Sequence, residues 1–175
     1  MIEYRRPRLD EAETFAALHV QCWREAYGGI VPDELVRDVN FEVRLPMWQN
    51  CLADGRSIVF GAYESVQAVG LIIAGKDESG KVSRADGHLS ALYVAQSHLK
   101  KGIGRRLISL ASKDWMKVGG KTLWLGVLSE NKNAIAFYEH LGAKFVRETI
   151  YSWGQYDLPN MIYVFEDMDK MIVKD

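Results

Sequence analysis

The feature that most constrains this chain is the stretch of residues 88–106, HLSALYVAQSHLKKGIGRR, which combines strand, turn and helix signals. Residues 88–94 alternate and are rich in strand formers, whereas residues 95–101 are polar and irregular. Gly102 and Gly104 then open a stretch whose apolar residues, at positions 103, 107, 110, 111 and 118, have helical spacing. This pattern predicts a strand that a short polar turn joins to the start of a helix.

The turn before this helix concentrates positive charge. Four of the seven residues from 100 to 106 are basic, namely Lys100, Lys101, Arg105 and Arg106. A helix N-terminus carries a partial positive charge, so cations there are unfavourable unless an anion binds the free N–H groups. Gly102 and Gly104 lack a Cβ, which would let a phosphate approach the backbone closely. The turn is therefore predicted to bind a phosphate or diphosphate; the alternative is a basic, solvated helix start after an ordinary turn.

Two common nucleotide-binding motifs do not fit this turn. The sequence has no G-x-x-x-x-G-K-[ST] segment, and Gly104 is followed by Arg105, Arg106 and Leu107 rather than by the third glycine of a dinucleotide-binding turn. The formal net charge of −1 also argues against a broad nucleic-acid or anionic-membrane surface, which requires a basic face. Local positive charge on such a chain suits a small anionic ligand better than a polymer.

The length of 175 residues predicts a single domain, residues 1–175, with a substantial core. Cys22 and Cys51 are the two cysteines, so no disulfide framework and no C-x-x-C metal or redox motif is expected. Reduced thiols predict a cytoplasmic location. No signal peptide is recognisable at the start, and the longest apolar run, residues 68–74, is too short to span a bilayer.

The remaining segments carry alternating helix and strand patterns. The expected helices are residues 10–28, 41–53 and 103–118, with shorter ones after Pro32 and Ser129. The expected strands are residues 2–6, 57–63, 67–74, 88–95, 122–128, 144–151 and 160–166. The segment between the last two strands, residues 152–159, is expected to be a loop. The order βαα–βββ–α–β–α–ββ predicts an α/β fold of the α+β type, a mixed sheet with helices on both faces.

Two motifs in this order are recognisable. LYVAQSHLKKGIGRRL and ENKNAIAFYEHLGAKFV closely resemble the two core motifs of the GNAT superfamily of acetyl-CoA-dependent N-acetyltransferases, over about residues 88–146. The resemblance implies a GNAT-like acyl-CoA N-acyltransferase fold with a central, mostly antiparallel sheet. It also implies direct transfer of an acetyl group from acetyl-CoA to a primary amine in a ternary complex. The alternative is a non-catalytic module that binds coenzyme A as a sensor or scaffold.

The resemblance assigns the residues that would hold acetyl-CoA. The family's Q/R-x-x-G-x-G/A turn falls on residues 99–104, with Leu99 where glutamine or arginine is usual. Binding should survive this departure, since the cradle works through backbone N–H groups. Asn131 matches the family asparagine near the pantetheine amides, and it could also cap the following helix. The expected contacts are Leu92, Tyr93 and Val94 with the pantetheine arm, and Leu99, Lys100, Lys101, Gly102, Ile103, Gly104 and Arg105 with the diphosphate.

The resemblance also assigns the catalytic residues. Tyr138 falls on the tyrosine expected to protonate the leaving thiolate; the alternative is packing in its helix stripe. His88 stands where many relatives carry a glutamate, and a histidine could accept a proton from the amine at neutral pH. The alternative for His88 is a hydrogen-bonded residue in a pocket wall. The backbone N–H of Val94 is a plausible donor to the developing oxyanion.

The amine acceptor is only partly constrained. Trp23 and Tyr27, at i and i+4 on one helix side, are expected to line the acceptor pocket; the alternative is core packing. No strongly acidic cleft is visible, so no aminoglycoside or polyamine is assigned, and a small-molecule or peptide amine remains the expected class. Tyr163 and Phe165 in the last strand are expected at an open sheet edge, which would permit a homodimer.

Overall fold

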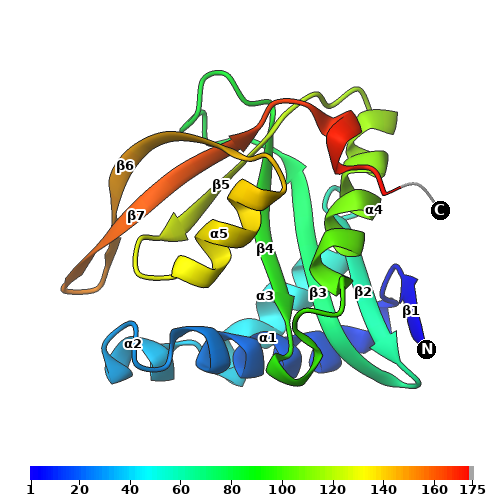
Figure 1. Ribbon diagram of the computed structural model, residues 1–175. Coiled ribbons are helices and arrows are strands. Elements are labelled where there is room, and N and C mark those ends of the chain that lie inside the picture. Colours follow the sequence, from blue (N-terminus) through cyan, green and yellow to red (C-terminus); the bar gives the residue numbers. More distant parts are fainter. Residues whose placement is uncertain (174–175) are drawn as a thin grey trace.

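The computed structural model describes residues 1–173, and within them seven strands form one sheet in the order β1-β2-β3-β4-β5-β7-β6 (Figure 1). Neighbouring strands in this part of the chain are antiparallel except for the parallel pair β4 and β5. The sheet is therefore mixed, as the sequence predicted. Its strands are β1 (Ile2–Arg5), β2 (Ile58–Glu64), β3 (Gln67–Lys76), β4 (Gly87–Val94), β5 (Leu123–Leu128), β6 (Lys144–Trp153) and β7 (Tyr156–Phe165).

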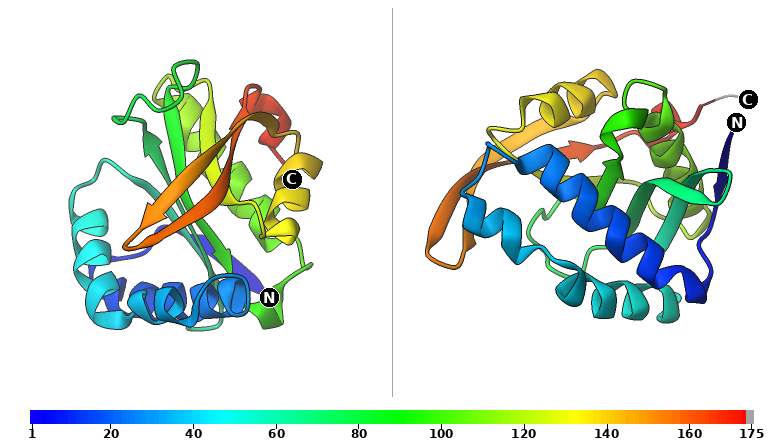
Figure 2. Two further views of the ribbon diagram at one scale, coloured as in Figure 1. Left: turned by 90° about the vertical axis from the view of Figure 1, so that its left-hand side faces the viewer. Right: turned by 90° about the horizontal axis from the view of Figure 1, so that it is seen from below.

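Helices cover both faces of the sheet. On one face lie α1 (Ala12–Tyr27) and α3 (Phe41–Ala53), joined through the short α2 (Asp33–Asp38). On the other lie α4 (Ile103–Lys117) and α5 (Lys132–His140). Figure 2 shows α3 and the pair α4 and α5 on opposite sides of the strands. The 3-10 helices are η1 (Leu9–Glu11), η2 (Gln96–His98) and η3 (Met168–Met171).

Aromatic side chains fill the core beneath α1 and α3. Phe15 of α1 and Trp48 of α3 are both 0% exposed, and their ring centroids lie 5.1 Å apart. Tyr63 of β2 closes the group with its ring 6.0 Å from Phe15. Burial of three large rings drives this face together, because each removes 150–250 Å² of mostly apolar surface from water. Among residues 1–173, no helix is both long and apolar enough to cross a membrane.

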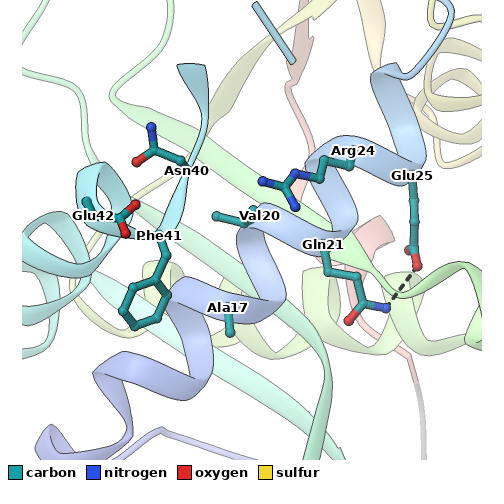
Figure 3. Close-up of a pocket in the computed structure, with 8 residues that line it drawn as sticks. All are labelled: Ala17, Val20, Gln21, Arg24, Glu25, Asn40, Phe41 and Glu42. Atoms are coloured by element: carbon teal, nitrogen blue, oxygen red, sulfur yellow. Dashed lines mark hydrogen bonds between the residues drawn. The ribbon is translucent and has the colours of Figure 1, made fainter. Parts of the chain in front are cut away.

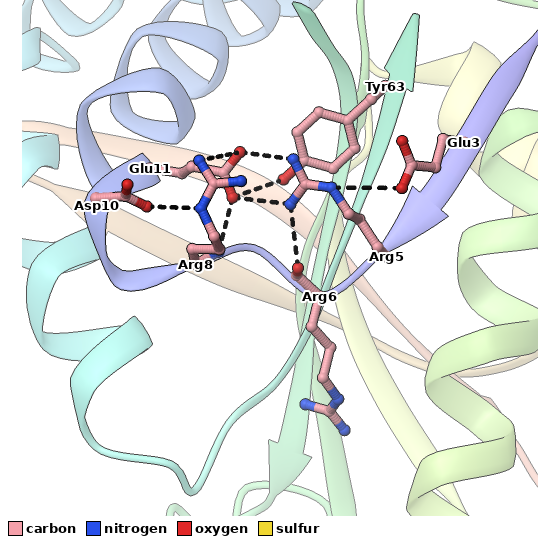
Figure 4. A network of polar contacts seen from close by, with 7 residues as sticks. All are labelled: Glu3, Arg5, Arg6, Arg8, Asp10, Glu11 and Tyr63. Carbon is pink, nitrogen blue, oxygen red and sulfur yellow. Dashed lines mark hydrogen bonds and ion pairs between the residues drawn. The ribbon is translucent and has the colours of Figure 1, made fainter. Parts of the chain in front are cut away.

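A polar network anchors β1 to the start of α1 (Figure 4). Both terminal nitrogens of Arg5 donate to the Glu11 carboxylate, at 2.8 and 2.7 Å, and the backbone N–H of Arg8 donates to it at 2.7 Å. The Arg5 guanidinium also lies 3.8 Å from the centre of the Tyr63 ring. The hydrogen bond from Arg5 lowers the pKa of Glu11 to about 2, against the opposing effect of burial. Glu11 is therefore charged at neutral pH and buried within a complete set of donors.

The terminal hairpin differs from the prediction. β6 and β7 are each longer than expected, so that Gly154 and Gln155 alone separate strands where a loop over residues 152–159 was expected. Pro159 is tolerated in β7 because it precedes Asn160, the first β7 residue paired with β5, so β5 does not need its missing N–H. The Pro159 carbonyl accepts from the Ser129 N–H at 2.9 Å.

The expected open edge is wrong as well. β7 lies between β5 and β6, so Tyr163 and Phe165 are each 1% exposed and cannot serve as an edge. The edge strand at this end of the sheet is β6. The expectation that β7 supports a homodimer therefore loses its structural basis, while the oligomeric state itself stays a prediction.

Candidate active site

The candidate site is an opening in the sheet between β4 and β5. Among the described residues, β4 pairs with β5 at only two positions, Gly87 with Leu123 and His88 with Trp124. β4 nevertheless continues to pair with β3 as far as Val94, so one edge of its second half lacks a neighbouring strand. Figure 1 shows β4 and β5 diverging beyond their paired ends. The backbone N–H and C=O groups of this free edge are available to a ligand.

A bulge in β4 coincides with the divergence. Ile73 pairs with Ala91 and Ala74 pairs with Leu89, which leaves Ser90 as the extra residue on β4. A β-bulge bends its strand and increases the local twist. Because Ser90 lies two residues after His88, the last β4 residue paired with β5, the bulge turns β4 away where the opening begins.

Tyrosines from both faces of the sheet meet at this opening. Tyr138 of α5 is buried, and burial together with the nearby Tyr27 hydroxyl raises its pKa. Tyr27 belongs to α1 on the opposite face; burial raises its pKa, and hydrogen bonding to Asn131 and Tyr93 opposes that effect. Residues on opposite faces can interact in this way because the strands between them have separated. The opening thus brings together Tyr27, Tyr93, Asn131 and Tyr138, which we call the tyrosine cluster.

The hydroxyl groups of this cluster are hydrogen-bond donors at neutral pH. Burial raises the pKa of Tyr93 well above its usual value, and the neighbouring Tyr27 and Tyr138 raise it further. Asn131 caps α5, since its side-chain oxygen accepts from the Ala134 N–H at 3.2 Å. The capping alternative for Asn131 is therefore confirmed, and a contact with pantetheine stays a prediction. Tyr138 is buried as its packing alternative requires, but it also faces the opening through its interaction with Tyr27.

The glycine turn lies at the N-terminus of α4. Gly102 is the N-cap residue with φ +79°, in the left-handed region, and no atom of the described chain lies within 4 Å of the position its Cβ would take. No described side chain caps this helix end, while Lys100, Lys101 and Arg105 are exposed around it. These features give a helix N-terminus that an anion can approach.

Gly104 lies where α4 packs against α5. A Cβ at this position would lie 3.1 Å from Cζ of Phe137 in α5. The small residue therefore permits close packing of α4 against α5. Its expected contact with a diphosphate stays a prediction. Ile103 is 2% exposed, so it can offer a ligand little beyond its backbone N–H. Leu99 is 52% exposed and projects from the same turn.

His88 lies at the closed end of the opening. Its ring stacks on Trp124 with centroids 3.9 Å apart, and its Nδ1 lies 3.3 Å from the Ser90 hydroxyl. Burial lowers the pKa of His88, partly offset by Asp77. Val94 follows six residues later, about 20 Å along an extended strand. The structure thus places His88 in a wall away from the tyrosine cluster, and a function as base requires a bridging water or acceptor.

Trp23 and Tyr27 both pack and border the opening. Their ring centroids lie 4.2 Å apart, and Trp23 lies 5.3 Å from Trp153 at the end of β6. Tyr151 approaches Trp153 at 6.0 Å, and the Tyr156 hydroxyl donates to Glu34 of α2 at 3.0 Å. The β6–β7 hairpin thus completes an aromatic wall on the α1 side of the opening.

Sequence reasoning missed Arg44 of α3. This residue acts electrostatically on both His19 and Tyr93, which places its charge near the tyrosine cluster. The signal was present, because Arg44 lies four residues before Trp48 and eight before Leu52, on a helix stripe that is otherwise apolar. An arginine on an otherwise apolar stripe indicates a possible anion contact.

A groove on the described surface lies elsewhere. It has a volume of about 580 Å³ and runs between α1 and the start of α3, where Gln21 donates to Glu25 at 2.8 Å (Figure 3). None of the expected site residues lines it. The residues that do are Ala17, Val20, Gln21, Arg24, Glu25, Asn40, Phe41 and Glu42. Within residues 1–173, no three His, Cys, Asp or Glu side chains gather as metal ligands would.

Known proteins with similar sequences or folds agree with this architecture. The chain is 26% identical over 149 residues to the uncharacterized N-acetyltransferase YuaI of Bacillus subtilis (strain 168), covering 85% of this chain and 83% of that protein. Its fold matches the PaiA N-acetyltransferase of Thermoplasma acidophilum in complex with coenzyme A, with a TM-score of 0.70, 22% identity, and 93% and 98% of the two chains covered. YncA of Salmonella typhimurium, solved with acetyl-CoA, gives a TM-score of 0.69 at 19% identity, with 94% and 93% covered.

The family itself is established by sequence. The model of the Acetyltransferase (GNAT) family matches residues 14–143, which include α1, the free edge of β4, the glycine turn and α5. The strands β4 and β5, between which the sheet opens, and the uncapped start of α4 lie within that match. The chain belongs to the GNAT family of acetyltransferases.

Proposed function

We propose that residues 1–175 form one N-acetyltransferase domain that moves the acetyl group of acetyl-CoA to a primary amine by direct attack in a ternary complex. The observation that carries this proposal is the opening itself, where one edge of β4 has no neighbouring strand among the described residues beyond its pairing with β5, and β4 leads into the uncapped N-terminus of α4. A ligand entering from the α4 and α5 face and a second one from the α1 and α3 face would meet there. Such proximity of two bound reactants is the main requirement of a direct transfer.

The residues present fit acetyl-CoA, which would supply a thioester activated toward amines. The uncapped N-terminus of α4 offers backbone N–H groups to a diphosphate, and Lys100, Lys101 and Arg105 add positive charge. The free edge of β4 offers Leu92, Tyr93 and Val94 to an amide-bearing arm. Leu99, Gly102, Ile103, Gly104 and Asn131 complete the proposed binding residues.

Tyr138 is the proposed proton donor to the leaving sulfur. Burial keeps its hydroxyl protonated, which is the state a donor needs. The N–H of Val94, at the end of the free edge, is the proposed donor to the oxyanion. His88 is the proposed base and would act through water, since it lies at the closed end of the opening. Trp23 and Tyr27 are the proposed walls for the acceptor.

Calorimetric titration with acetyl-CoA, coenzyme A and ATP is the first test. We expect micromolar affinity for both coenzyme A forms and none for ATP. Release of free thiol in the presence of a panel of amines then tests transfer. Binding without transfer to any amine would favour a sensor or scaffold module, and absence of binding would contradict both. The cytoplasmic location and the absence of nucleic-acid and membrane partners stay predictions.

A further inference from the structure

Three buried polar groups lie without protein partners around Tyr93 on the α1 and α3 face. They are Nδ1 of His19, Nε1 of Trp23 and Nε of Arg44, none of which has a hydrogen-bond partner within residues 1–173. His19 is 5% exposed and Trp23 is 8% exposed. Native proteins satisfy the large majority of buried polar side-chain atoms, so several unmatched groups around one residue indicate a ligand site.

Arg44 carries the formal charge of this group. Its Nη1 donates to the Met47 sulfur at 3.7 Å, and sulfur is a weak acceptor. Among the described residues, no carboxylate forms an ion pair with it within 4.0 Å. A partly buried guanidinium without an anion is costly, because desolvation is not compensated by charge pairing.

The charge is placed next to the proposed reaction centre. Arg44 acts electrostatically on His19 and on Tyr93, and Tyr93 in turn interacts with Tyr27 and Tyr138. The ring of His19 lies 5.0 Å from that of Tyr93 and 6.1 Å from that of Trp48. Arg44 and His19 thus both neighbour Tyr93, which belongs to the opening where the amine would react. The face is that of α1 and α3, opposite the glycine turn and α5.

We propose that Arg44 binds a carboxylate of the acceptor, so that the acceptors are free amino acids or similar small amines that carry a carboxylate. The inference rests on the proposed acetyl transfer and names its substrate class. A single guanidinium matches one carboxylate in charge, and its planar donors suit carboxylate geometry. His19 and Trp23 can donate further hydrogen bonds. Burial and Arg44 lower the pKa of His19 to about 3, so His19 adds no second charge. The same cation disfavours polycationic acceptors.

Matched acceptors test the inference without any mutation. Each L-amino acid is compared with its carboxamide as acceptor in the thiol-release assay, with identical side chains and controlled amine ionisation. We expect kcat/KM for the acids to exceed that for the amides by roughly 10- to 100-fold, the range for hydrogen bonds to a charged partner. Equal or higher activity with the amides would overturn the inference and leave the proposed acetyl transfer intact.

Two variants test whether Arg44 is the source of the preference for acids over amides. Arg44→Gln should raise KM for the acids to near that for the amides and change activity toward the amides little. Arg37→Gln, an exposed arginine of α2, is the matched control and should retain the preference for acids. A preference that persists in folded Arg44→Gln would overturn the assignment to Arg44. If Arg44→Gln does not fold, as judged by circular dichroism, the comparison of acids with amides in the native protein decides.

Direct binding separates this inference from the proposed function. Thermal shift measures stabilisation of the native protein by L-amino acids and by their amides, with coenzyme A present and absent. Stabilisation by the acids alone supports the carboxylate site even if no acetyl transfer is detected, in which case the proposed function fails by itself. Absence of both stabilisation and transfer would overturn the inference.

Discussion

Gly102→Ala should weaken acetyl-CoA binding by about 5- to 30-fold. Gly102 has φ +79°, and a left-handed alanine costs roughly 1–2 kcal/mol. The variant can relieve that strain by moving the turn out of the left-handed region, because no neighbouring atom within 4 Å holds the Cβ in place. Binding must then restore the original backbone, and 1–2 kcal/mol corresponds to the stated loss in affinity.

Gly119→Ala is the matched control at the other end of α4. Gly119 has φ +89°, and no described atom lies within 4 Å of its Cβ position. The strain is therefore of the same kind and size, but it lies some 15 helical residues from the proposed cradle. Strain that the free protein does not relieve should lower Tm in either variant, by at most about 2–8 °C for 1–2 kcal/mol in a chain of this size. Only Gly102→Ala should change the Kd for acetyl-CoA.

Calorimetric titration of the two variants and the native protein measures the Kd for acetyl-CoA. Scanning calorimetry gives Tm, which reports the strain that remains in each free protein. If Gly102→Ala binds acetyl-CoA as well as Gly119→Ala does, while its Tm stays near the native value because the free turn has relaxed, the turn is not the diphosphate site. That result would favour the alternative interpretation of the glycine turn as a basic, solvated helix start.

Further predictions follow from the tyrosine cluster, His88 and the buried charges. Tyr138→Phe should lower kcat about 100-fold or more with an unchanged Kd for acetyl-CoA, since only the proton donor is lost. Because burial lowers the pKa of His88, the acidic limb of the kcat/KM profile should lie below pH 6.5, and His88→Gln should remove it; an unaltered profile would leave His88 as packing against Trp124. Glu11→Gln should cost about 3 kcal/mol of unfolding free energy at pH 7, from a pKa lowered from 4.5 to about 2, and this contribution should vanish in the native protein as pH falls from 4.5 through 2. His19 has a pKa lowered from 6.5 to about 3, so it favours unfolding as pH falls below 6.5; urea titrations should show a loss of about 2 kcal/mol between pH 6.5 and 5 that His19→Gln lacks.

The fold was predictable where local patterns and global packing agree. Helix α4 has apolar residues at helical spacing and ends before Gly119, and the hairpin of β2 and β3 turns at Ser65, so these elements lie where the sequence placed them. The terminal hairpin was misjudged because residues 152–159 contain the turn signals Gly154 and Pro159 together. Pro159 does not interrupt β7 because β5 pairs with β7 only from Asn160 onward, and that pairing is known only from the folded structure.

No local sequence pattern predicts the order of the strands in the sheet. β7 inserts between β5 and β6, which joins residues 123–128 to residues 160–165 across the sheet. Nothing within residues 156–165 distinguishes an edge strand from an interior one, since the apolar run suits either. The mistaken open edge at Tyr163 and Phe165 follows directly from that ambiguity.

The acceptor side of the site was hidden for a related reason. On α3, Arg44 shares a stripe with Trp48 and Leu52, and a stripe of that kind predicts burial without saying what a basic member would contact. His19 comes from α1 and Tyr93 from β4, so the environment of Arg44 is assembled from segments that lie 25 and 49 positions away in the chain. The glycine turn could be found from sequence because an anion cradle is built from consecutive residues. The proposed carboxylate site around the partly buried Arg44 becomes visible only in the folded chain, where no described acidic side chain forms an ion pair with that guanidinium.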